Sequence, residues 1–289
     1  MIRRFERFAC IDWSGAKGER QKGIAIAVSD GIGRTPQLID GPWSREAVLD
    51  WVLDHAACRS NMLIGIDFSA ALPFLDANAY FPGWDLSPAD ARELWRLVDE
   101  ICANEPHLGA ASLVDHPDAS RHFRRHGARQ GDLFGASNGR HRLVETICRE
   151  SRHAPATSSF NLVGAAQVGK SSLTGMRLLN RLNRRVALWP FDPVPAHGPV
   201  IVEVYTTIAA RQAGLKGGSK MRDAARLRVG LAGYGIAEPP VLARYDDHST
   251  DAILTAAWLA QAASDARLWR PPLMTGEIAA VEGWTFGVP

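Results

Sequence analysis

A continuous apolar segment at residues 62–67, with Asp67 at its C-terminal end, limits the fold more than any other feature of the chain. A strand without polar alternation is typical of a sheet that helices cover on both faces. Two other apolar segments, residues 8–13 and 200–205, each contain an acidic residue. The sequence therefore predicts an α/β domain in which acidic side chains lie at or near the ends of buried strands.

The remaining patterns predict one mixed sheet whose first strands form an antiparallel meander. Residues 23–28 and 37–39 favour two further strands, because turn-forming Gly and Asp lie between them. Ser44 is typical of a helix N-cap, and a helix is expected directly after it. The other helices expected in the core cover residues 172–182, about 219–231 and 251–260.

The pattern changes between about residue 74 and residue 158. A helix is expected at residues 89–103, and a stretch rich in Arg and His follows it. Residues 121–153 contain eight Arg and only three acidic residues, although the formal net charge of the whole chain is +2. Neither end has the composition of a linker, so we expect a helical, Arg/His-rich insertion at about 74–158 in a single domain, residues 1–289.

This Arg-rich stretch has two interpretations. It could hold a nucleic-acid backbone, because Arg pairs with phosphate through parallel hydrogen bonds. It could equally be a solvated surface that happens to be rich in Arg. The residues considered for contact with DNA or RNA are Arg121, Arg124, Arg125, Arg140 and Arg142.

Composition excludes several classes of protein. With 46% hydrophobic and 22% charged residues, the chain is neither disordered nor a disulfide scaffold. A net charge of +2 excludes binding of nucleic acid by bulk charge alone. The four cysteines form no Cys-x-x-Cys pair, which excludes a zinc ribbon and favours a reduced, cytoplasmic setting. No apolar run approaches the roughly 18 residues of a membrane span, so no membrane association is expected.

A set of four acids predicts a metal site: Asp12, Asp67, Glu203 and Asp251. A carboxylate among apolar residues is costly to bury, and several that converge repel one another unless cations lie between them. Mg²⁺ or Mn²⁺ would suit such a site, because hard cations bind carboxylate oxygens. Two such ions, about 3.5–4 Å apart, can catalyse phosphodiester cleavage. Taken singly, each acid could instead be a turn or cap residue, with Asp251 as an N-cap in the first turn of its helix.

Short motifs surround these acids. They are CIDWSG at residues 10–15, GID at 65–67 followed by LP at 72–73, VEVY at 202–205 and HSTDA at 248–252. In this order they resemble the family catalogued as domain of unknown function 429, whose members are predicted to be RNase H-like nucleases related to RuvC. Residues 160–169 and WPF at 189–191 also resemble family features.

The resemblance implies an RNase H-like fold: a five-stranded mixed sheet flanked by helices, with acids on the first strand, the fourth strand and the last helix. It also implies that Asp12 bridges two metal ions, that Asp67 holds one of them and that Asp251 holds the other. Glu203 would be a further catalytic acid near the site.

Three other residues near the motifs bear on this expectation. His248 could be a general acid, a neighbour of the metal site or a simple helix-terminal residue. Thr206 stands where the family usually has Pro after its Glu-Val-Tyr motif. Asp247 precedes Asp251 by four residues, whereas RuvC-type helices space their two acids by three, so Asp247 is left out of the ligand set.

A second motif, residues 164–171, matches the phosphate-binding P-loop pattern G-x-x-x-x-G-K-[ST]. An apolar segment that is expected to be a strand precedes it, and a helix is expected after it. Lys170 would contact the β- and γ-phosphates, and Ser171 would bind the Mg²⁺ ion of a nucleotide. The fixed positions are Gly164, Gly169, Lys170 and Ser171.

Three functions therefore stay open. A divalent-metal-dependent nuclease is favoured by the order of the acids. A P-loop-type nucleotide-binding protein or phosphotransferase competes with it, although more than half the chain precedes the motif and a P-loop usually opens its domain. The third is a non-catalytic RNase H-like scaffold that keeps the fold without the chemistry.

Overall fold

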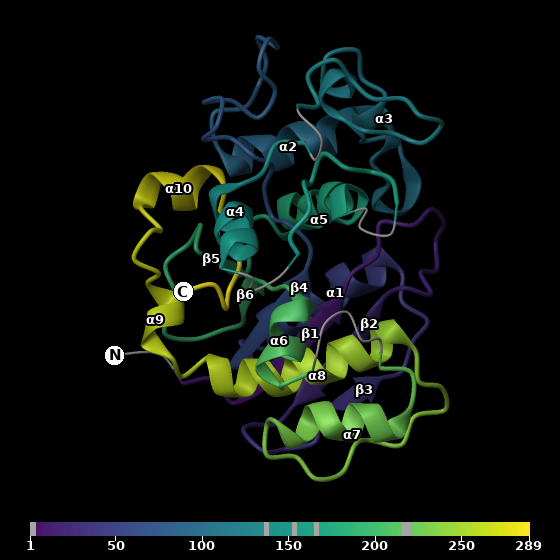
Figure 1. Cartoon of the computed structure of the whole chain (residues 1–289), viewed down its shortest axis with the longest axis vertical. Helices are drawn as coiled ribbons and strands as arrows, with labels where there is room; N and C mark the ends of the chain where they lie inside the picture. The colour runs from purple at the N-terminus through teal and green to yellow at the C-terminus, as the bar shows by residue number, and fades with distance from the viewer. Residues whose placement is uncertain (1–3, 136–138, 152–154, 165–167, 216–220) are drawn as a thin grey trace.

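A six-stranded mixed sheet lies at the centre of the molecule (Figure 1). The computed structural model describes residues 4–135, 139–151, 155–164, 168–215 and 221–289. The strands are β1 (Arg7–Asp12), β2 (Ala25–Ser29), β3 (Gln37–Ile39), β4 (Met62–Asp67), β5 (Ala187–Trp189) and β6 (Val200–Glu203). Their order across the sheet is β3-β2-β1-β4-β6-β5.

Strand pairing confirms the predicted antiparallel meander. β2 runs antiparallel to both β1 and β3. β4 runs parallel to β1, and β6 runs parallel to both β4 and β5. The expectation of five strands is wrong by one, because β5 adds a sixth strand at the edge. β3 is equally short but follows turn-forming Gly and Pro, whereas no Gly or Pro lies directly before β5 to mark its start.

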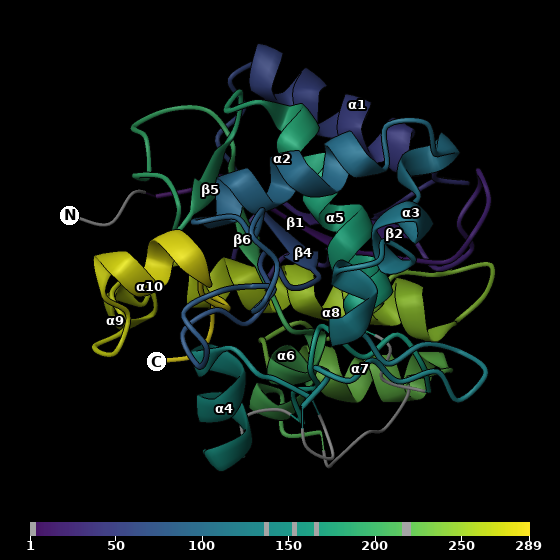
Figure 2. The same cartoon turned by 90° about the horizontal axis from the view of Figure 1, so that it is seen from above.

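Helices cover both faces of the sheet, as the apolar strands require (Figure 2). One face packs against α1 (Arg45–Ala57), α2 (Ala91–Ile101) and α5 (Val168–Leu182). The other packs against α6 (Thr206–Gln212), α7 (Ala224–Ala232) and α8 (Asp247–Ala262). We call them the α5 face and the α8 face. Since side chains alternate along a strand, consecutive residues of a strand belong to opposite faces.

Short helices lie mainly between α2 and α5 and near the C-terminus. α7 begins later than the predicted helix at residues 219–231, of which residues 219 and 220 lie outside the described residues. Within the described ranges, no helix combines the length and the apolar character needed to cross a membrane. The short helices are η1 (Pro106–Leu108), α3 (Ala111–Val114), η2 (Ala119–His122), α4 (Leu143–Glu150), α9 (Ala266–Trp269) and α10 (Gly276–Val281).

Two helix starts bear on the predicted caps. Ser44 Oγ accepts a hydrogen bond from the backbone N–H of Ala47 at 3.0 Å, so the predicted N-cap of α1 is confirmed. α8 begins at Asp247, with Asp246 as its N-cap. The alternative that Asp251 caps this helix is therefore wrong, and Asp251 lies one turn inside α8.

A buried ion network joins α4 to the end of β6. Arg142 is 1% exposed, and its guanidinium lies 2.6 Å from Glu203 Oε1 and 3.0 Å from Glu145 Oε1. Glu203 also accepts hydrogen bonds from the backbone N–H of Ala70 and from the hydroxyl of Thr285. These contacts tie the segment before α5, the sheet and the C-terminal segment together. Each buried carboxylate of the network has a donor, as burial requires.

Removal of the Arg142 guanidinium is expected to destabilise the protein strongly. Arg142→Ala leaves the carboxylates of Glu203 and Glu145 buried without their cation, which typically costs about 3–5 kcal/mol. Urea denaturation followed by tryptophan fluorescence measures the change in the free energy of unfolding.

Arg149→Ala is the matched control, because Arg149 lies exposed on the same helix. Its free energy of unfolding should change by less than about 0.5 kcal/mol. A similar, small change in Arg142→Ala would contradict a stabilising role for the network.

Candidate functional site

Two of the predicted acids, Asp12 and Asp67, lie side by side at the carboxyl ends of β1 and β4, where they are partners in the parallel register. Cys10, two residues before Asp12, packs in the core of the α8 face, and so does Leu63 of β4. Strand alternation therefore places both carboxylates on the α8 face.

Helix α8 brings the third predicted acid, Asp251, to the same place. Asp251 is close enough to interact electrostatically with Asp67. His248 Nδ1 lies 3.2 Å from Asp12 Oδ2. Because His248 and Asp251 are three residues apart, they lie on the same side of the helix. We call Asp12, Asp67 and Asp251 the carboxylate cluster.

Burial and mutual repulsion raise the pKa of Asp67. Burial is the largest cause, and the negative charges of Asp12 and Asp251 add to it. A hydrogen bond from Thr206 Oγ1, 3.2 Å from Asp67 Oδ2, acts in the opposite direction. Carboxyl groups with raised pKa values on one face favour the binding of protons or cations.

Asp12 and His248 shift each other's titration. Burial raises the pKa of Asp12, and the hydrogen bond with His248 partly offsets this effect. The same hydrogen bond raises the pKa of His248. His248, in the first turn of α8, is therefore a direct neighbour of Asp12.

Glu203, the fourth predicted acid, does not join the cluster. It is the register partner of Ile66, which packs in the core of the α5 face, so Glu203 points to that face. The next residue, Val204, packs on the α8 face. Glu203 is 4% exposed and ion-paired with Arg142. Glu203 thus lies on the opposite face of the sheet from the other three acids, although its charge also raises the pKa of Asp67.

The carboxylate cluster offers the oxygen ligands that Mg²⁺ and Mn²⁺ prefer. Among the residues that the structure describes, no group of three or more His, Cys, Asp or Glu side chains is already placed to hold a metal ion. Asp247, outside the predicted ligand set, forms an ion pair with Arg222 at 3.1 Å.

The P-loop match lacks the strand that should precede it. In the described structure, residues 160–163 belong to no strand of the sheet, and Asn161 forms an isolated bridge with Arg124. Phe160 packs instead against Phe123, between α2 and α5. The prediction of a strand here is wrong, because the apolar pattern of this segment serves a local aromatic core.

The residues of the motif itself are only partly described. Gly164 has a φ of +86°, and residues 165–167 lie outside the described residues. Gly169, Lys170 and Ser171 lie in the first turns of α5. The Ser171 hydroxyl donates to the carbonyl of Val168 at 2.7 Å, as helical serines often do.

The five arginines considered for nucleic-acid contact fall into two groups. Arg142 is buried, and Arg140 is ion-paired and donates to three backbone carbonyls. These two therefore stabilise the fold and do not present a cation to the surface. Arg121 and Arg125 form ion pairs with nearby aspartates, and Arg124 is exposed.

Thr206 is not among the predicted site residues. Thr206 is the first residue of α6, and its hydroxyl contacts Asp67. One feature of the sequence could have pointed to it: Thr206 replaces the Pro of the motif that residues 202–205 resemble. This replacement supplies a hydroxyl donor shortly after β6. His248 carried a clearer signal, because it lies one helical turn before Asp251.

Comparison of this chain with family models, with curated proteins and with solved structures gave no match. Its function must therefore be inferred from the carboxylate cluster and the contacts around it.

Asp67→Asn is expected to stabilise the metal-free protein at neutral pH. The pKa of Asp67 is higher in the folded protein than in the unfolded chain. Folding stability therefore falls as the pH rises from about 4, the unfolded-state pKa, through the folded-state pKa. An uncharged Asn avoids this loss, with a gain of roughly 0.5–2 kcal/mol, the range common for stabilising substitutions.

Urea denaturation in EDTA, from below about pH 4 to neutral pH, measures the free energy of unfolding of the wild type and of Asp67→Asn. Below about pH 4, Asp67 is protonated in both states, so the advantage of the variant should disappear. Asp50→Asn, exposed on α1, is the control and should gain no stability. An advantage of Asp67→Asn that grew towards low pH would contradict the raised pKa.

Proposed function

We propose that this protein is a divalent-metal-dependent nuclease with an RNase H-like fold. The observation that carries the proposal is the in-register pairing of Asp12 with Asp67, on the face where α8 contributes Asp251. Acids on the first strand, the fourth strand and the last long helix are the arrangement that the motifs imply. In this proposal β5 is an addition at the edge of a five-stranded RNase H-like sheet.

The three carboxylates would hold Mg²⁺ or Mn²⁺, with Asp12 shared between two ions and with Asp67 and Asp251 on one ion each. When bound, two such ions activate a water molecule and stabilise the leaving oxygen of a phosphodiester. Because the pKa values of Asp12 and Asp67 are raised, the metal-free site holds protons more tightly than free carboxylates do, and metal binding would compete with them.

Neighbouring side chains would orient these ligands. His248 Nδ1 interacts with Asp12 Oδ2, and Thr206 Oγ1 donates to Asp67 Oδ2, so one oxygen of each carboxylate is held. Such outer contacts orient ligands and tune their affinity for a metal. Glu203 has no direct role in this proposal, because Arg142 holds it on the α5 face.

Nucleic acid is the proposed substrate, since metal pairs on carboxylates suit phosphodiester cleavage. Arg121 and Arg124 lie exposed between α2 and α5 and could contact a phosphate backbone. Their contribution should be weak and salt-dependent, because the chain as a whole carries a net charge of only +2.

Loss of an acid from the cluster is expected to abolish cleavage. Asp12→Asn and Asp251→Asn should each lower the Mn²⁺- or Mg²⁺-dependent cleavage rate of labelled DNA and RNA by about a thousand-fold or more. This magnitude follows because metal ions contribute several kcal/mol of charge stabilisation. Melting temperature should not fall, since Asn fills the space of Asp.

Asp247→Asn is the matched control on the same helix and should retain activity. Cleavage that survives in both Asp12→Asn and Asp251→Asn would refute the proposed nuclease activity.

Calorimetry with Mn²⁺ distinguishes the proposed nuclease from a non-catalytic scaffold. The wild type should bind Mn²⁺, and Asp12→Asn should lose this binding. Wild-type protein that neither binds Mn²⁺ nor cleaves would support the scaffold.

A further inference from the structure

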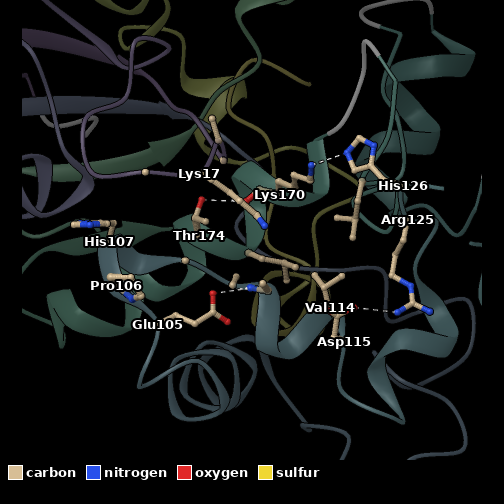
Figure 3. Close-up of a pocket in the computed structure, with 18 of the residues that line it drawn as sticks. Lys17, Glu105, Pro106, His107, Val114, Asp115, Arg125, His126, Lys170 and Thr174 are labelled. Carbon is tan, nitrogen blue, oxygen red and sulfur yellow. Dashed lines mark hydrogen bonds and ion pairs between the residues drawn. The ribbon is translucent and has the colours of Figure 1, made fainter.

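A basic pocket lies near the carboxyl end of β1, as the carboxylate cluster does, but on the opposite, α5 face of the sheet. It is a cavity of about 490 Å³ between the loop that joins β1 to β2, the start of α5 and residues 105–129. Lys17 and Lys170 lie on one side of it, and Val114 and Asp115 lie on the other (Figure 3). We call this cavity the Lys17–Lys170 pocket. None of its residues has a role in the proposed cleavage.

Two contacts hold the β1–β2 loop against α5. Gly15 packs so closely that a Cβ atom there would lie 2.3 Å from the carbonyl carbon of Lys170. Arg45 is 1% exposed, and it donates hydrogen bonds to two carbonyl oxygens of the same loop. Lys17, two residues after Gly15, is thereby held next to Lys170.

The side chains that line the pocket carry an excess of positive charge. Five are Lys or Arg, and two are Asp or Glu. Both acids already have donors: Glu105 accepts hydrogen bonds from backbone N–H groups of α3, and Asp115 pairs at 3.2 Å with Arg125, which also lines the pocket. The charge of Arg45 faces neutral carbonyl oxygens, and burial lowers its pKa to about 10.

Lys17 and Lys170 face the same space. Lys170 Nζ lies 2.8 Å from His126 Nε2, which orients the ammonium group (Figure 3). Burial lowers the pKa of Lys170, and the charge of Lys17 adds to the effect. An anion between the two ammonium groups would relieve this repulsion and form charge-assisted hydrogen bonds.

The rest of the lining is largely apolar. Leu162, Leu173, Val114 and Pro106 contribute to it. The volume exceeds what a phosphate ion needs and falls in the range of about 300–1,000 Å³ that is typical of sites for organic ligands. The matching ligand is anionic at one end and apolar at the other.

We propose that the Lys17–Lys170 pocket binds a nucleotide, with the phosphate between Lys17 and Lys170 and the base against the apolar lining. The nucleotide is either free or part of a strand that also reaches the carboxylate cluster. The β1–β2 loop borders both sites, since a Cβ atom on Gly23 of this loop would lie 3.3 Å from His248. This binding mode differs from a P-loop, because it uses Lys17 and requires neither Mg²⁺ nor Ser171.

Calorimetric titration of the full chain in EDTA tests the proposal. The probes are AMP, GMP, CMP and UMP, a 5′-phosphorylated DNA pentanucleotide and inorganic phosphate. Lys17→Gln and Lys170→Gln should each weaken nucleotide binding about ten- to hundred-fold, as expected for the loss of a charged hydrogen bond. Lys22→Gln, exposed in the same loop but outside the pocket, should bind like the wild type.

Two further measurements test where the base binds and whether the nucleotide is free or part of a strand. Val114→Trp fills the apolar side, so it should weaken nucleotide binding and leave phosphate binding unchanged. Tighter binding of the pentanucleotide than of mononucleotides would identify a strand as the source, and the reverse order would identify a free nucleotide. Circular dichroism of every variant controls for misfolding, and exposed Lys17 is the safer of the two lysines to change.

Several results would overturn the proposal. One is that no nucleotide binds at millimolar concentration. Another is that Lys17→Gln and Lys170→Gln both bind nucleotides as tightly as the wild type. Binding that requires Mg²⁺ and is lost in Ser171→Ala but not in Lys17→Gln would indicate a P-loop instead. Because the titrations contain EDTA, they do not depend on metal-dependent cleavage. The protein can bind nucleotides without cleaving nucleic acid, or cleave nucleic acid without binding nucleotides in this pocket.

Discussion

The ion pair between Arg142 and Glu203 is the contact on which the rest of the arrangement depends. It joins α4 to the end of β6, and Thr285 attaches the C-terminal segment to the same carboxylate. A buried charge that loses its partner is strongly unfavourable, so these three parts of the chain must pack together. The register of β6 turns Glu203 to the α5 face, away from the three acids of the carboxylate cluster, and Arg142 compensates its charge there.

The carboxylate cluster and the Lys17–Lys170 pocket lie at one edge of the sheet, one on each face, and the β1–β2 loop borders both. A net charge of +2 conceals this separation, because acidic and basic groups cancel in the total. In the two proposals taken together, charges of opposite sign at neighbouring sites would suit a ligand whose phosphates contact lysines at one site and metal ions at the other. The two proposals nevertheless stand on separate observations, the strand register for the cluster and the lining for the pocket.

Much of the fold could be predicted because its signals are local. β3 and β4 have the predicted bounds, and Ser44 caps α1 as expected. The errors also have local causes. β5 has no turn-forming Gly or Pro directly before it, and the apolar residues around Phe160 resemble a strand although they pack in an aromatic core. α8 begins earlier than predicted because Asp246 provides its cap.

For the site, the sequence by itself determined which residues could take part: acids beside apolar strands, and an acid and a histidine one turn apart on an apolar helix. Only the tertiary structure decided which of them meet. The register of β1 with β4 pairs Asp12 with Asp67, whereas the register of β6 turns Glu203 to the opposite face. Arg142 looks like a surface cation in the sequence until its burial against Glu203 is seen. The physical reason is that a residue's own neighbours set its local conformation. The packing of elements distant in sequence sets the face, the partner and the depth of a side chain.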